Sequence, residues 1–300
     1  MTIPARALAD LQEDFPGVRP AEPLARHTTW GIGGPADFFV EIASRNDLAA
    51  LRRWGHVHGV PLMPIGQGSN LLVGDGGVRG GVVRLRGEFE EVRFQGDAAH
   101  VGAGVLLPRF ARQAAERGLT GAEPLCGIPG TLGGGLRTNA GTPEGDLGAL
   151  VESVDLMDGE GRVRTVPRAE LLFGYRRADL GDGWALSAQL KLRRGDRNDI
   201  LSSVDKQLAR RTERQPLGTK NCGSVFKNPP GDFAARLIEA AGLKGRRIGG
   251  ARVSPKHANF IENVDNASAA DVRQLIALIQ NTVRDRFGTA LELEVWTVGE

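Results

Sequence analysis

The stretch GIPGTLGGGLRTNAG, residues 127–141, carries the strongest signal in this chain, because six of its positions are glycine. Glycine adopts positive φ and lets backbone N–H groups approach an anion, at an entropic cost that a simple connector would avoid. A second loop of this kind, Gly66-Gln67-Gly68-Ser69-Asn70, follows the short apolar run 60–65. Either loop alone is equally consistent with an ordinary turn. Together, and with 42 glycines in 300 residues against a usual share of about 7%, they favour binding of a phosphate-bearing dinucleotide.

Neither loop has the form of the best-known nucleotide motifs. A Rossmann fingerprint needs G-x-G-x-x-G at the opening of a helix, with an acidic residue about 20 positions later. Here Asn70 is followed by Leu71-Leu72-Val73-Gly74, which predicts a strand and a turn. No Walker lysine follows either loop. A Rossmann dehydrogenase and a P-loop kinase are therefore both disfavoured.

Composition is typical of a globular protein of two or three domains, with 41% hydrophobic and 25% charged residues. A net charge of +2 is too small to indicate nucleic-acid binding. Two cysteines without a C-x-x-C pattern argue against a disulfide scaffold and against a metal site. The first residues lack the apolar segment of a secretion signal, and no run approaches the roughly 18 apolar residues of a membrane span. We therefore expect a cytoplasmic protein with no membrane span and no obligate protein partner.

Hydrophobic periodicity and capping residues predict a mixed α+β chain with much antiparallel pairing in its middle part. We expect a helix that begins at Ser44 and ends before Gly55, and another that begins at Pro108 and ends at Gly118. The last helix has Ser268 as N-cap and Gly288 as its end. The remaining expected elements are an N-terminal helix, strands at 37–42, 60–65, 82–85, 99–103, 151–157, 163–166, 184–192 and 291–298, and helices at 199–211, 233–241 and 270–287.

Three further segments carry candidate chemistry. Residues 214–230 (RQPLGTKNCGSVFKNPP) combine cations, a hydroxyl and amides between two helices, and Ser224 follows a glycine at the predicted start of an extended segment. An isolated serine more often serves the backbone, and it is the surrounding motif that favours proton transfer. Arg176 stands beside the chain's one tyrosine, Tyr175, and its guanidinium suits a carboxylate or phosphate, although a solvated basic corner is the simpler interpretation. Glu292 and Glu294 alternate with apolar residues and point the same way on a strand.

These residues resemble the family of UDP-N-acetylenolpyruvoylglucosamine reductases, flavoenzymes of bacterial peptidoglycan synthesis, over nearly the full length. The segments that carry the resemblance, in chain order, are TTWGIGG at 28–34, the loops 66–70 and 127–141, Gly174-Tyr175-Arg176, CGSVFKNP at 222–229, Ile248-Gly249-Gly250 and Leu293-Glu294-Val295. Each is weak evidence by itself, and their order is highly specific. The short segment 192–198 lacks the tyrosine-bearing loop of the longer subgroup, so the chain resembles the shorter one. Arg137 departs from the small or apolar residue usual at its position, and its role is open.

The resemblance implies a two-subdomain FAD-binding fold of the vanillyl-alcohol-oxidase (PCMH) type, followed by a C-terminal α+β substrate-binding domain. The expected boundaries are 1–86 and 87–197 for the two FAD-binding subdomains and 198–300 for the substrate-binding domain. Non-covalent FAD would lie between the first two, with its pyrophosphate against backbone amides. The cofactor-binding residues implied are Gly66, Gln67, Gly68, Ser69, Asn70, Leu71, Gly127, Ile128, Gly130, Thr131, Gly134, Asn139 and Gly141.

The resemblance also implies the reaction. NADPH reduces the flavin and leaves, and UDP-N-acetylglucosamine enolpyruvate then takes its place and receives hydride from flavin N5. Arg176 and Glu294 would stabilise the enolate-like charge while Ser224 donates a proton to the carbon beside the carboxylate. The residues implied to contact the nucleotide sugar are Tyr175, Arg214, Asn228 and His257. The alternatives are another flavin oxidase of the same fold, with flavin attached through His27 or Cys126, and a nucleotide-sugar-binding module without turnover.

Overall fold

The computed structural model describes residue 3 and residues 5–300, which form two compact units. The first unit contains the described residues up to Arg19 together with Phe38–Gly66 and Gly80–Arg210. The second contains Pro20–Asp37, Gln67–Arg79 and Arg211–Glu300. Each unit is thus assembled from three separate segments of the chain.

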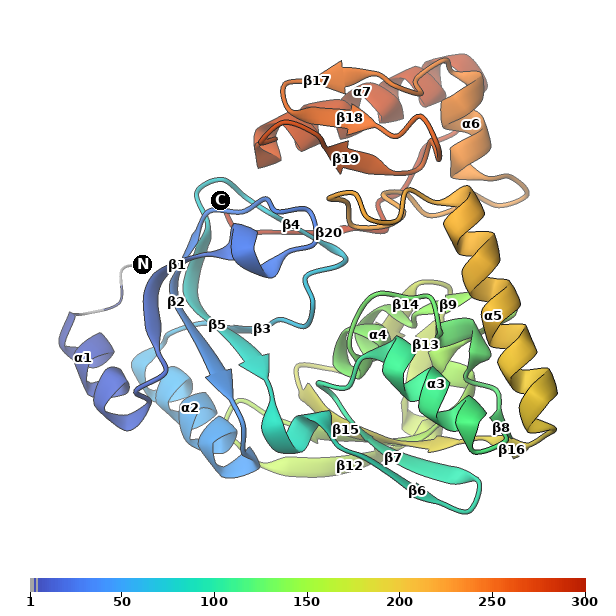
Figure 1. The fold of residues 1–300 in the computed structure, drawn as a ribbon. Helices are drawn as coiled ribbons and strands as arrows, with labels where there is room; N and C mark the ends of the chain where they lie inside the picture. The colour runs from blue at the N-terminus through green and yellow to red at the C-terminus, as the bar shows by residue number, and fades with distance from the viewer. Residues whose placement is uncertain (1–2, 4) are drawn as a thin grey trace. The chain divides into compact units, whose positions relative to one another are not determined.

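Five antiparallel strands form the main sheet of the first unit, in the order β12-β11-β15-β7-β6 (Figure 1). Their bounds, in the same order, are Val163–Pro167, Val151–Met157, Trp184–Lys191, Ala98–Gly102 and Val92–Gln95. Helix α3 (Leu107–Glu116) buries Phe110, Ala111 and Ala114 in the core that covers this sheet. The strands expected in this part of the chain and their antiparallel pairing are confirmed.

A second sheet has the strand order β1-β2-β5-β3, and its β3–β5 pair is parallel. Helix α2 packs its apolar face into the core of this region. The bounds are α1 Ala5–Asp14, β1 Arg19–Pro23, β2 Pro35–Ile42, α2 Arg45–His58, β3 Leu62–Pro64 and β5 Val78–Leu85. The first unit also contains three short antiparallel pairs: β8 (Leu119–Thr120) with β16 (Arg193–Arg194), β9 (Gly141–Thr142) with β10 (Gly145–Asp146), and β13 (Leu172–Gly174) with β14 (Arg177–Asp179).

Helix α2 begins as expected, with the Ser44 hydroxyl accepting a hydrogen bond from the Asp47 amide at 3.1 Å. The expected end before Gly55 is wrong, because the helix continues to His58 and Gly59 is its left-handed cap at φ +63°. Gly55 serves packing instead, since a Cβ there would lie 2.7 Å from a methyl carbon of Leu62. A glycine within a helical pattern can therefore mark a close contact as well as an end.

The glycine-rich stretch 127–141 is a loop in part only, because it contains the helix α4 (Leu132–Thr138). Leu132 and Leu136 of this helix are fully buried in the core, so the stretch also contributes to packing. Gly135 is needed for close packing, because a Cβ there would lie 2.9 Å from a methyl carbon of Leu107. The residues before the helix, 127–131, form a turn, and Thr131 at the end of this turn is the N-cap of the helix.

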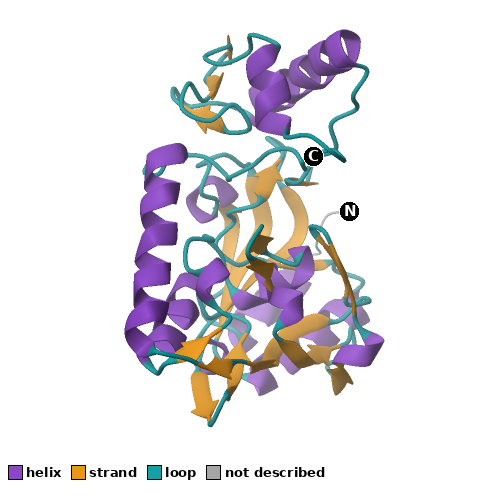
Figure 2. Ribbon diagram, turned by 90° about the vertical axis from the view of Figure 1, so that its right-hand side faces the viewer, coloured by secondary structure: helices purple, strands orange, loops and turns teal. Residues whose placement is uncertain are grey.

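The second unit combines a three-stranded antiparallel sheet, β17-β18-β19, with helices α6 and α7 (Figure 2). Helix α7 has the expected N-cap Ser268, which forms a capping box with Asp271, and the expected left-handed Gly288 at its end. Its bounds and those of its neighbours are α5 Arg197–Arg214, α6 Ala234–Ala240, β17 Arg247–Ile248, β18 Ala251–Val253, β19 Ile261–Asn263 and α7 Ala269–Phe287. Within residues 3 and 5–300, no helix has both the length and the apolarity that crossing a bilayer requires.

The last strand, β20, is Trp296–Val298 and pairs in parallel with β4 (Leu71–Val73). The expected strand over 291–298 is therefore too long. Residues 291–295 are extended but pair only through a single bridge, between Leu293 and Phe226. The bridge is formed by the Lys227 amide with the Glu292 carbonyl and by the Glu294 amide with the Val225 carbonyl. The N–H and carbonyl of Phe226 point to the opposite edge, where the Asn259 side chain bonds both.

Candidate functional site

The two glycine loops meet within the first unit, at Gly66 and Thr131. Gly66 directly follows Ile65, whose amide donates to the Val83 carbonyl at 2.8 Å and so ties the loop to strand β5. A Cβ on Gly66 would lie 2.6 Å from the Thr131 hydroxyl oxygen. The contact leaves no room for a side chain, so the glycine is required by the approach of the two loops.

Backbone donors remain available in the turn before α4. The first two amides of that helix, at Leu132 and Gly133, are already bonded to the carbonyls of residues 105 and 103, both at 2.8 Å. By contrast, the structure holds no acceptor among its described residues for the N–H groups of Gly130 and Thr131. At Gly134 a Cβ would meet nothing closer than the Thr131 hydroxyl, at 3.8 Å, so this glycine faces open space. Open backbone with unused N–H groups is suited to an anion.

The loop 67–71 lies in the second unit and is held by the segment that precedes it. The Thr29 amide donates to the Gly68 carbonyl at 3.2 Å, and a Cβ on Gly68, whose φ is +60°, would lie 2.2 Å from the His27 carbonyl oxygen. The amides of Gly68 and Asn70 donate to no group in the described part of the chain. The other residues of this loop that were expected to bind the cofactor, Gln67, Ser69 and Leu71, are half-buried.

These features fit FAD. A pyrophosphate needs backbone that approaches closely and N–H donors that no internal acceptor uses, and each loop offers such donors within its own unit. Gly127 and Ile128 lie in the same turn as Gly130, where the Ile128 amide is used internally, by the Leu125 carbonyl. The glycine at position 141 is explained by packing, because a Cβ there would lie 2.5 Å from the Asp146 Cβ in the β9–β10 pair. The individual cofactor contacts stay predictions.

Ser224 lies in a short extended segment that is bonded on both sides. On one side the Val225 amide donates to the Asn259 carbonyl at 2.9 Å. On the other the Glu294 amide donates to the Val225 carbonyl at 2.8 Å, and the Lys227 amide donates to the Glu292 carbonyl at 2.9 Å. The backbone on either side of Val225 is thus fixed, and Ser224 remains half-exposed beside it. The structure therefore brings the Ser224 segment and the Glu294 segment together.

Glu294 links this segment to the second glycine loop. The Asn70 side-chain amide donates to the Glu294 carbonyl at 3.0 Å, and the Trp296 amide donates to the Asn70 carbonyl at 3.0 Å. Burial raises the pKa of the Cys222 thiol well above its ordinary value, and the Glu294 carboxylate raises it further. The carboxylate, Cys222 and Asn70 thus form one neighbourhood in the second unit. Since Arg176 belongs to the first unit, its meeting with Ser224 and Glu294 stays a prediction.

Arg176 lies at the tip of the β13–β14 hairpin, whose closing pair is Gly174 with Arg177. The two loop residues are Tyr175, which is 57% exposed, and Arg176, which is half-buried. Arg176 has φ +52°, a conformation that side chains other than glycine and asparagine rarely adopt. Its guanidinium lies 5.4 Å from the centre of the Tyr175 ring, so the two side chains expected to contact the substrate form a pair.

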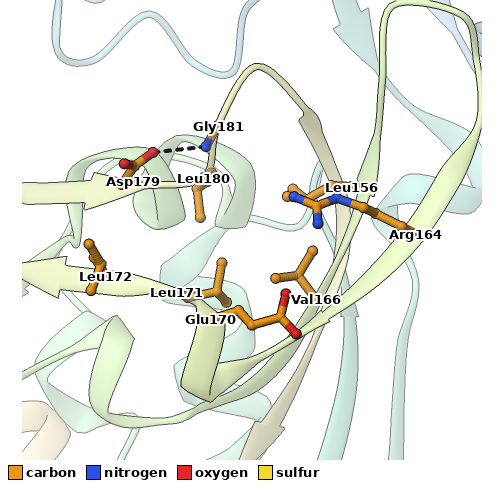
Figure 3. Close-up of a pocket in the computed structure, with 9 residues that line it drawn as sticks. All are labelled: Leu156, Arg164, Val166, Glu170, Leu171, Leu172, Asp179, Leu180 and Gly181. Carbon is orange, nitrogen blue, oxygen red and sulfur yellow. Dashed lines mark hydrogen bonds between the residues drawn. The ribbon is translucent and has the colours of Figure 1, made fainter.

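A pocket lies beside the base of this hairpin, within the first unit (Figure 3). Its walls combine leucines with a few charged side chains, and the Gly181 amide closes one edge by donating to the Asp179 carboxylate at 2.9 Å. None of the residues expected to bind cofactor or substrate lines this pocket. The lining residues are Leu156, Arg164, Val166, Glu170, Leu171, Leu172, Asp179, Leu180 and Gly181.

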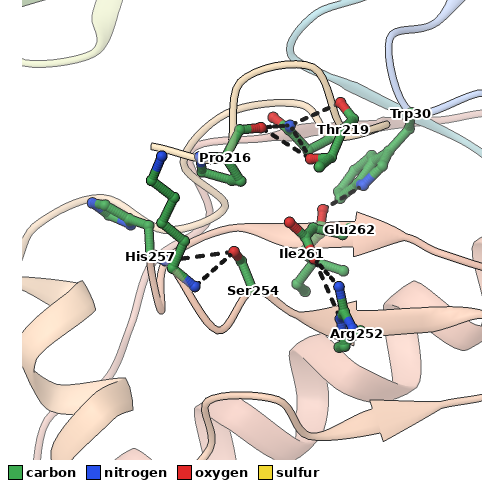
Figure 4. A network of polar contacts seen from close by, with 10 residues as sticks. Trp30, Pro216, Thr219, Arg252, Ser254, His257, Ile261 and Glu262 are labelled. Carbon is green, nitrogen blue, oxygen red and sulfur yellow. Dashed lines mark hydrogen bonds and ion pairs between the residues drawn. The ribbon is translucent and has the colours of Figure 1, made fainter. Parts of the chain in front are cut away.

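The residues expected to bind the nucleotide sugar in the second unit have different surroundings. Arg214 is the last residue of α5 and is exposed. The exposed Asn228 accepts a hydrogen bond from the Ala234 amide at 3.1 Å, at the start of α6. His257 accepts a hydrogen bond at Nδ1 from the Asn259 amide at 3.3 Å, and burial lowers its pKa, with Lys244 adding to the effect. Its backbone amide donates to the Ser254 hydroxyl (Figure 4).

Asn259 is a residue that the sequence analysis missed. It is buried, its Oδ1 accepts from the Phe226 amide at 3.0 Å, and its Nδ2 donates to the Phe226 carbonyl at 2.8 Å. It therefore acts as a strand partner for the segment that carries Ser224. Its signal in the sequence is a single polar residue between Ala258 and Phe260, where a buried asparagine needs partners.

Trp30 was quoted only as part of a motif, and the structure gives it a role. It is fully buried, and its Nε1 donates to the Ile261 carbonyl at 2.8 Å (Figure 4). Its own carbonyl accepts from the Asn263 side chain at 3.0 Å. The motif at 28–34 is thereby attached to strand β19, far away in the sequence.

Comparison with known proteins identifies both parts of the chain. The sequence profile described as "FAD binding domain" matches residues 36–167, and the one described as "UDP-N-acetylenolpyruvoylglucosamine reductase, C-terminal domain" matches residues 215–298. A UDP-N-acetylenolpyruvoylglucosamine reductase of Symbiobacterium thermophilum is 46% identical over 98% of this chain and 96% of its own length. Its counterpart in Moorella thermoacetica is 46% identical over 93% of this chain and 92% of its own length.

A solved structure agrees with these sequence relatives. The crystal structure of the UDP-N-acetylenolpyruvylglucosamine reductase of Thermus caldophilus superposes with a TM-score of 0.82 at 38% identity, over 92% of this chain and 97% of that one. The expected α+β architecture, an FAD-binding fold of the vanillyl-alcohol-oxidase type followed by a substrate-binding domain, is confirmed. On the extent of these matches, this chain belongs to the UDP-N-acetylenolpyruvoylglucosamine reductase family.

Proposed function

We infer that this chain is an FAD-containing, NADPH-dependent reductase that converts UDP-N-acetylglucosamine enolpyruvate to UDP-N-acetylmuramate for peptidoglycan synthesis. Identity of 46% over almost the whole length of a reductase supports the activity. The observation that carries the assignment of residues is the pairing of the Ser224 segment with the Glu294 segment, which are about 70 positions apart in sequence and are bonded through Val225.

Bound FAD supplies the two-electron chemistry that connects NADPH with the enolpyruvyl group. The chain would hold it through the backbone of the turn 127–131, through Gly66 and through the loop 67–71. The evidence on these residues is the contact of Gly66 with Thr131 and the unused N–H groups of Gly130, Thr131, Gly68 and Asn70. An amide N–H aimed at a phosphate oxygen forms a charge-assisted hydrogen bond, which is stronger than one between neutral groups.

The proposed role of Ser224 is to donate its hydroxyl proton to the carbon beside the substrate carboxylate. A serine hydroxyl is a weak acid, but an enolate carbon is basic enough to accept a proton from a hydroxyl held in the correct place. The fixed backbone around Val225 supplies that placement. Arg176 and Glu294 would stabilise the charge and the enol form, and loss of one such donor is worth on the order of 3 kcal/mol of barrier.

We propose further that the enzyme works in the cytoplasm, where NADPH and nucleotide sugars are found, and without an obligate protein partner. Arg214, Asn228, Tyr175 and His257 are its proposed contacts to the nucleotide sugar. Arg214 offers a guanidinium fork that suits the diphosphate.

The test separates the two halves of the reaction by following the flavin absorbance in single turnover. We expect the Ser224→Ala enzyme to bind FAD and to be bleached by NADPH at the wild-type rate, because no proton from Ser224 enters that step. Its reoxidation by the enolpyruvyl substrate should slow by about 10²- to 10⁴-fold. The control is Ser202→Ala on the exposed side of α5, which should change neither rate. Equal slowing of both halves would show that Ser224 supports the fold and does not supply the proton.

A further inference from the structure

Phe173 and Ala178 pack the two strands of the β13–β14 hairpin against the core of the first unit, whereas its tip, which carries Arg176, is more exposed. Leu172 on its first strand is 70% exposed, and Tyr175 at its tip is 57% exposed. A pocket borders the base of both strands, at Leu172 and Asp179 (Figure 3). Since close packing normally fixes the position of an element, the exposed tip depends on further contacts for its orientation.

Asn139 provides such a contact. It caps the end of α4 in the left-handed conformation, with φ +45°, and is 2% exposed. Its Nδ2 donates to the Gly174 carbonyl at 3.0 Å, and its Oδ1 accepts from the Gly148 amide at 2.8 Å. The Gly174 carbonyl belongs to the peptide group that leads directly into Tyr175 and Arg176. The asparagine therefore fixes the plane of the peptide from which the hairpin tip begins.

Arg168 holds the same hairpin from a second side. Its Nε donates to the Gly148 carbonyl at 3.2 Å, and its Nη1 donates to the Leu171 carbonyl at 2.8 Å. Its guanidinium lies 5.0 Å from the centre of the Phe173 ring on β13. A Cβ on Gly148 would lie 2.6 Å from the Phe173 ring and 2.9 Å from the Asn139 oxygen. Asn139 and Arg168 thus both bond to Gly148, and a side chain at Gly148 would collide with Phe173 and Asn139.

We propose that Asn139 is a positioning residue for the reduction, which sets the orientation of Arg176 through its hydrogen bond to the Gly174 carbonyl. This inference rests on the proposed function of Arg176 in stabilising the enolate-like charge. It gives Asn139 a task different from the cofactor contact that the family resemblance implies. Both polar ends of its side chain are used within the chain, at Gly148 and Gly174.

The experiment is a double-mutant cycle with Asn139→Asp and Arg176→Ala. Aspartate keeps the oxygen that accepts from the Gly148 amide and loses the donor to Gly174. We expect Asn139→Asp to retain its FAD content and its rate of bleaching by NADPH, and to lose about 10- to 100-fold in the rate of reoxidation by the enolpyruvyl substrate, as a small displacement of a reacting group does. In the Arg176→Ala background the same substitution should change that rate by less than about 2-fold, because coupled residues are not additive.

Two further variants keep the proposal testable if a buried aspartate disturbs the fold. Asn139→Gly retains the left-handed backbone and removes both side-chain bonds, and Arg168→Ala loosens the hairpin from its exposed side. Both should slow reoxidation and leave bleaching unchanged. Arg162→Ala, a surface arginine with no bond to the hairpin, is the control and should change neither.

Equal losses in the two backgrounds, or a loss of bound FAD that accounts for the loss of rate, would overturn the positioning role. Reoxidation at the wild-type rate in Arg176→Ala itself would instead overturn the proposed function of Arg176, and this inference with it. The two failures are thus told apart by a single variant.

Discussion

At the scale of single residues, Arg176 combines a proposed chemical role with a strained backbone conformation. Among the described residues with side chains, Ala21, Asn139, Arg176 and Asn266 have positive φ in the left-handed region. Asparagine adopts this region readily, whereas for arginine it costs about 1 to 2 kcal/mol. Glycine at position 176 would remove that cost, which supports the role proposed for the Arg176 guanidinium. Strained backbone conformations of this kind occur often at functional sites.

His257 gives a prediction about pH at this scale. Burial lowers the pKa of its imidazole from the ordinary value near 6.5, and Lys244 lowers it further. The unfolded chain therefore binds the proton more tightly than the folded one, so protonation favours unfolding and stability falls as the pH drops below about 6.5. We expect His257→Gln to flatten the pH dependence of the free energy of unfolding just below about pH 6.5, by less than about 1.4 kcal/mol per pH unit.

Urea titrations at several pH values measure this slope, and His56→Gln is the matched control because His56 is exposed on α2. The control should leave the slope unchanged. Parallel curves for His257→Gln and the wild type would mean that the half-buried imidazole does not contribute to the acid sensitivity.

At the scale of elements, α7 depends on a cap from a distant part of the chain. The Asp75 carboxylate accepts hydrogen bonds from the amides of Ala269 and Ala270, at 2.7 and 2.9 Å. A carboxylate at a helix N-terminus satisfies amides that have no partner in the helix and interacts favourably with its dipole. Helix α7 contributes six buried residues to the core of the second unit, so its first turn matters beyond the helix itself.

We expect Asp75→Ala to lower the free energy of unfolding by about 1 to 3 kcal/mol, because both amides lose a charged acceptor. Asp75→Asn retains one acceptor oxygen and should lose less. Chemical denaturation measures both variants, and Asp265→Ala, which removes an exposed ion pair with Arg247, should cost at most about 1 kcal/mol. An Asp75→Ala protein as stable as the Asp265→Ala control would show that the capping box of Ser268 suffices alone.

The same scale shows what sequence could and could not predict. The strands at 151–157 and 184–192 and the cap at Ser268 were predictable because period and capping chemistry act locally. The helix α4 within the glycine stretch was not, because Gly133 and Gly135 are tolerated there through close packing on residues distant in sequence. The contact of Asn259 with Phe226 was not predictable either, because no local pattern links two residues 33 positions apart. The order of motifs along the chain was enough to propose the site residues. The hydrogen bonds of Asn139 and Asn259 could be found only from the three-dimensional structure.

At the scale of the whole molecule, the chain interleaves its two units. The second unit contains Arg211–Glu300 together with Pro20–Asp37 and Gln67–Arg79. These two early segments lie within residues 1–86, which were expected to form the first FAD-binding subdomain. Both early segments enter the core of the second unit, since Trp30 and Leu72 are fully buried there among residues of α6 and α7. Residues 67–70 of the second glycine loop and the proposed catalytic serine and glutamate thus belong to one folded unit.

This interleaving predicts that a fragment of residues 211–300 does not fold alone, although a family profile matches 215–298. The fragment lacks Trp30, whose burial in a core is worth about 3 to 5 kcal/mol, and the strand β4 that pairs with β20. A loss of that size is comparable with the whole stability of a small domain.

We expect the 211–300 fragment to show no cooperative thermal transition by circular dichroism and poor dispersion of its NMR spectrum. Joining 20–37 and 67–79 to it through flexible linkers should restore a cooperative transition, whereas the same construction with Trp30→Ala should not. Cooperative unfolding of 211–300 by itself would show that this fragment has a complete core without segments 20–37 and 67–79.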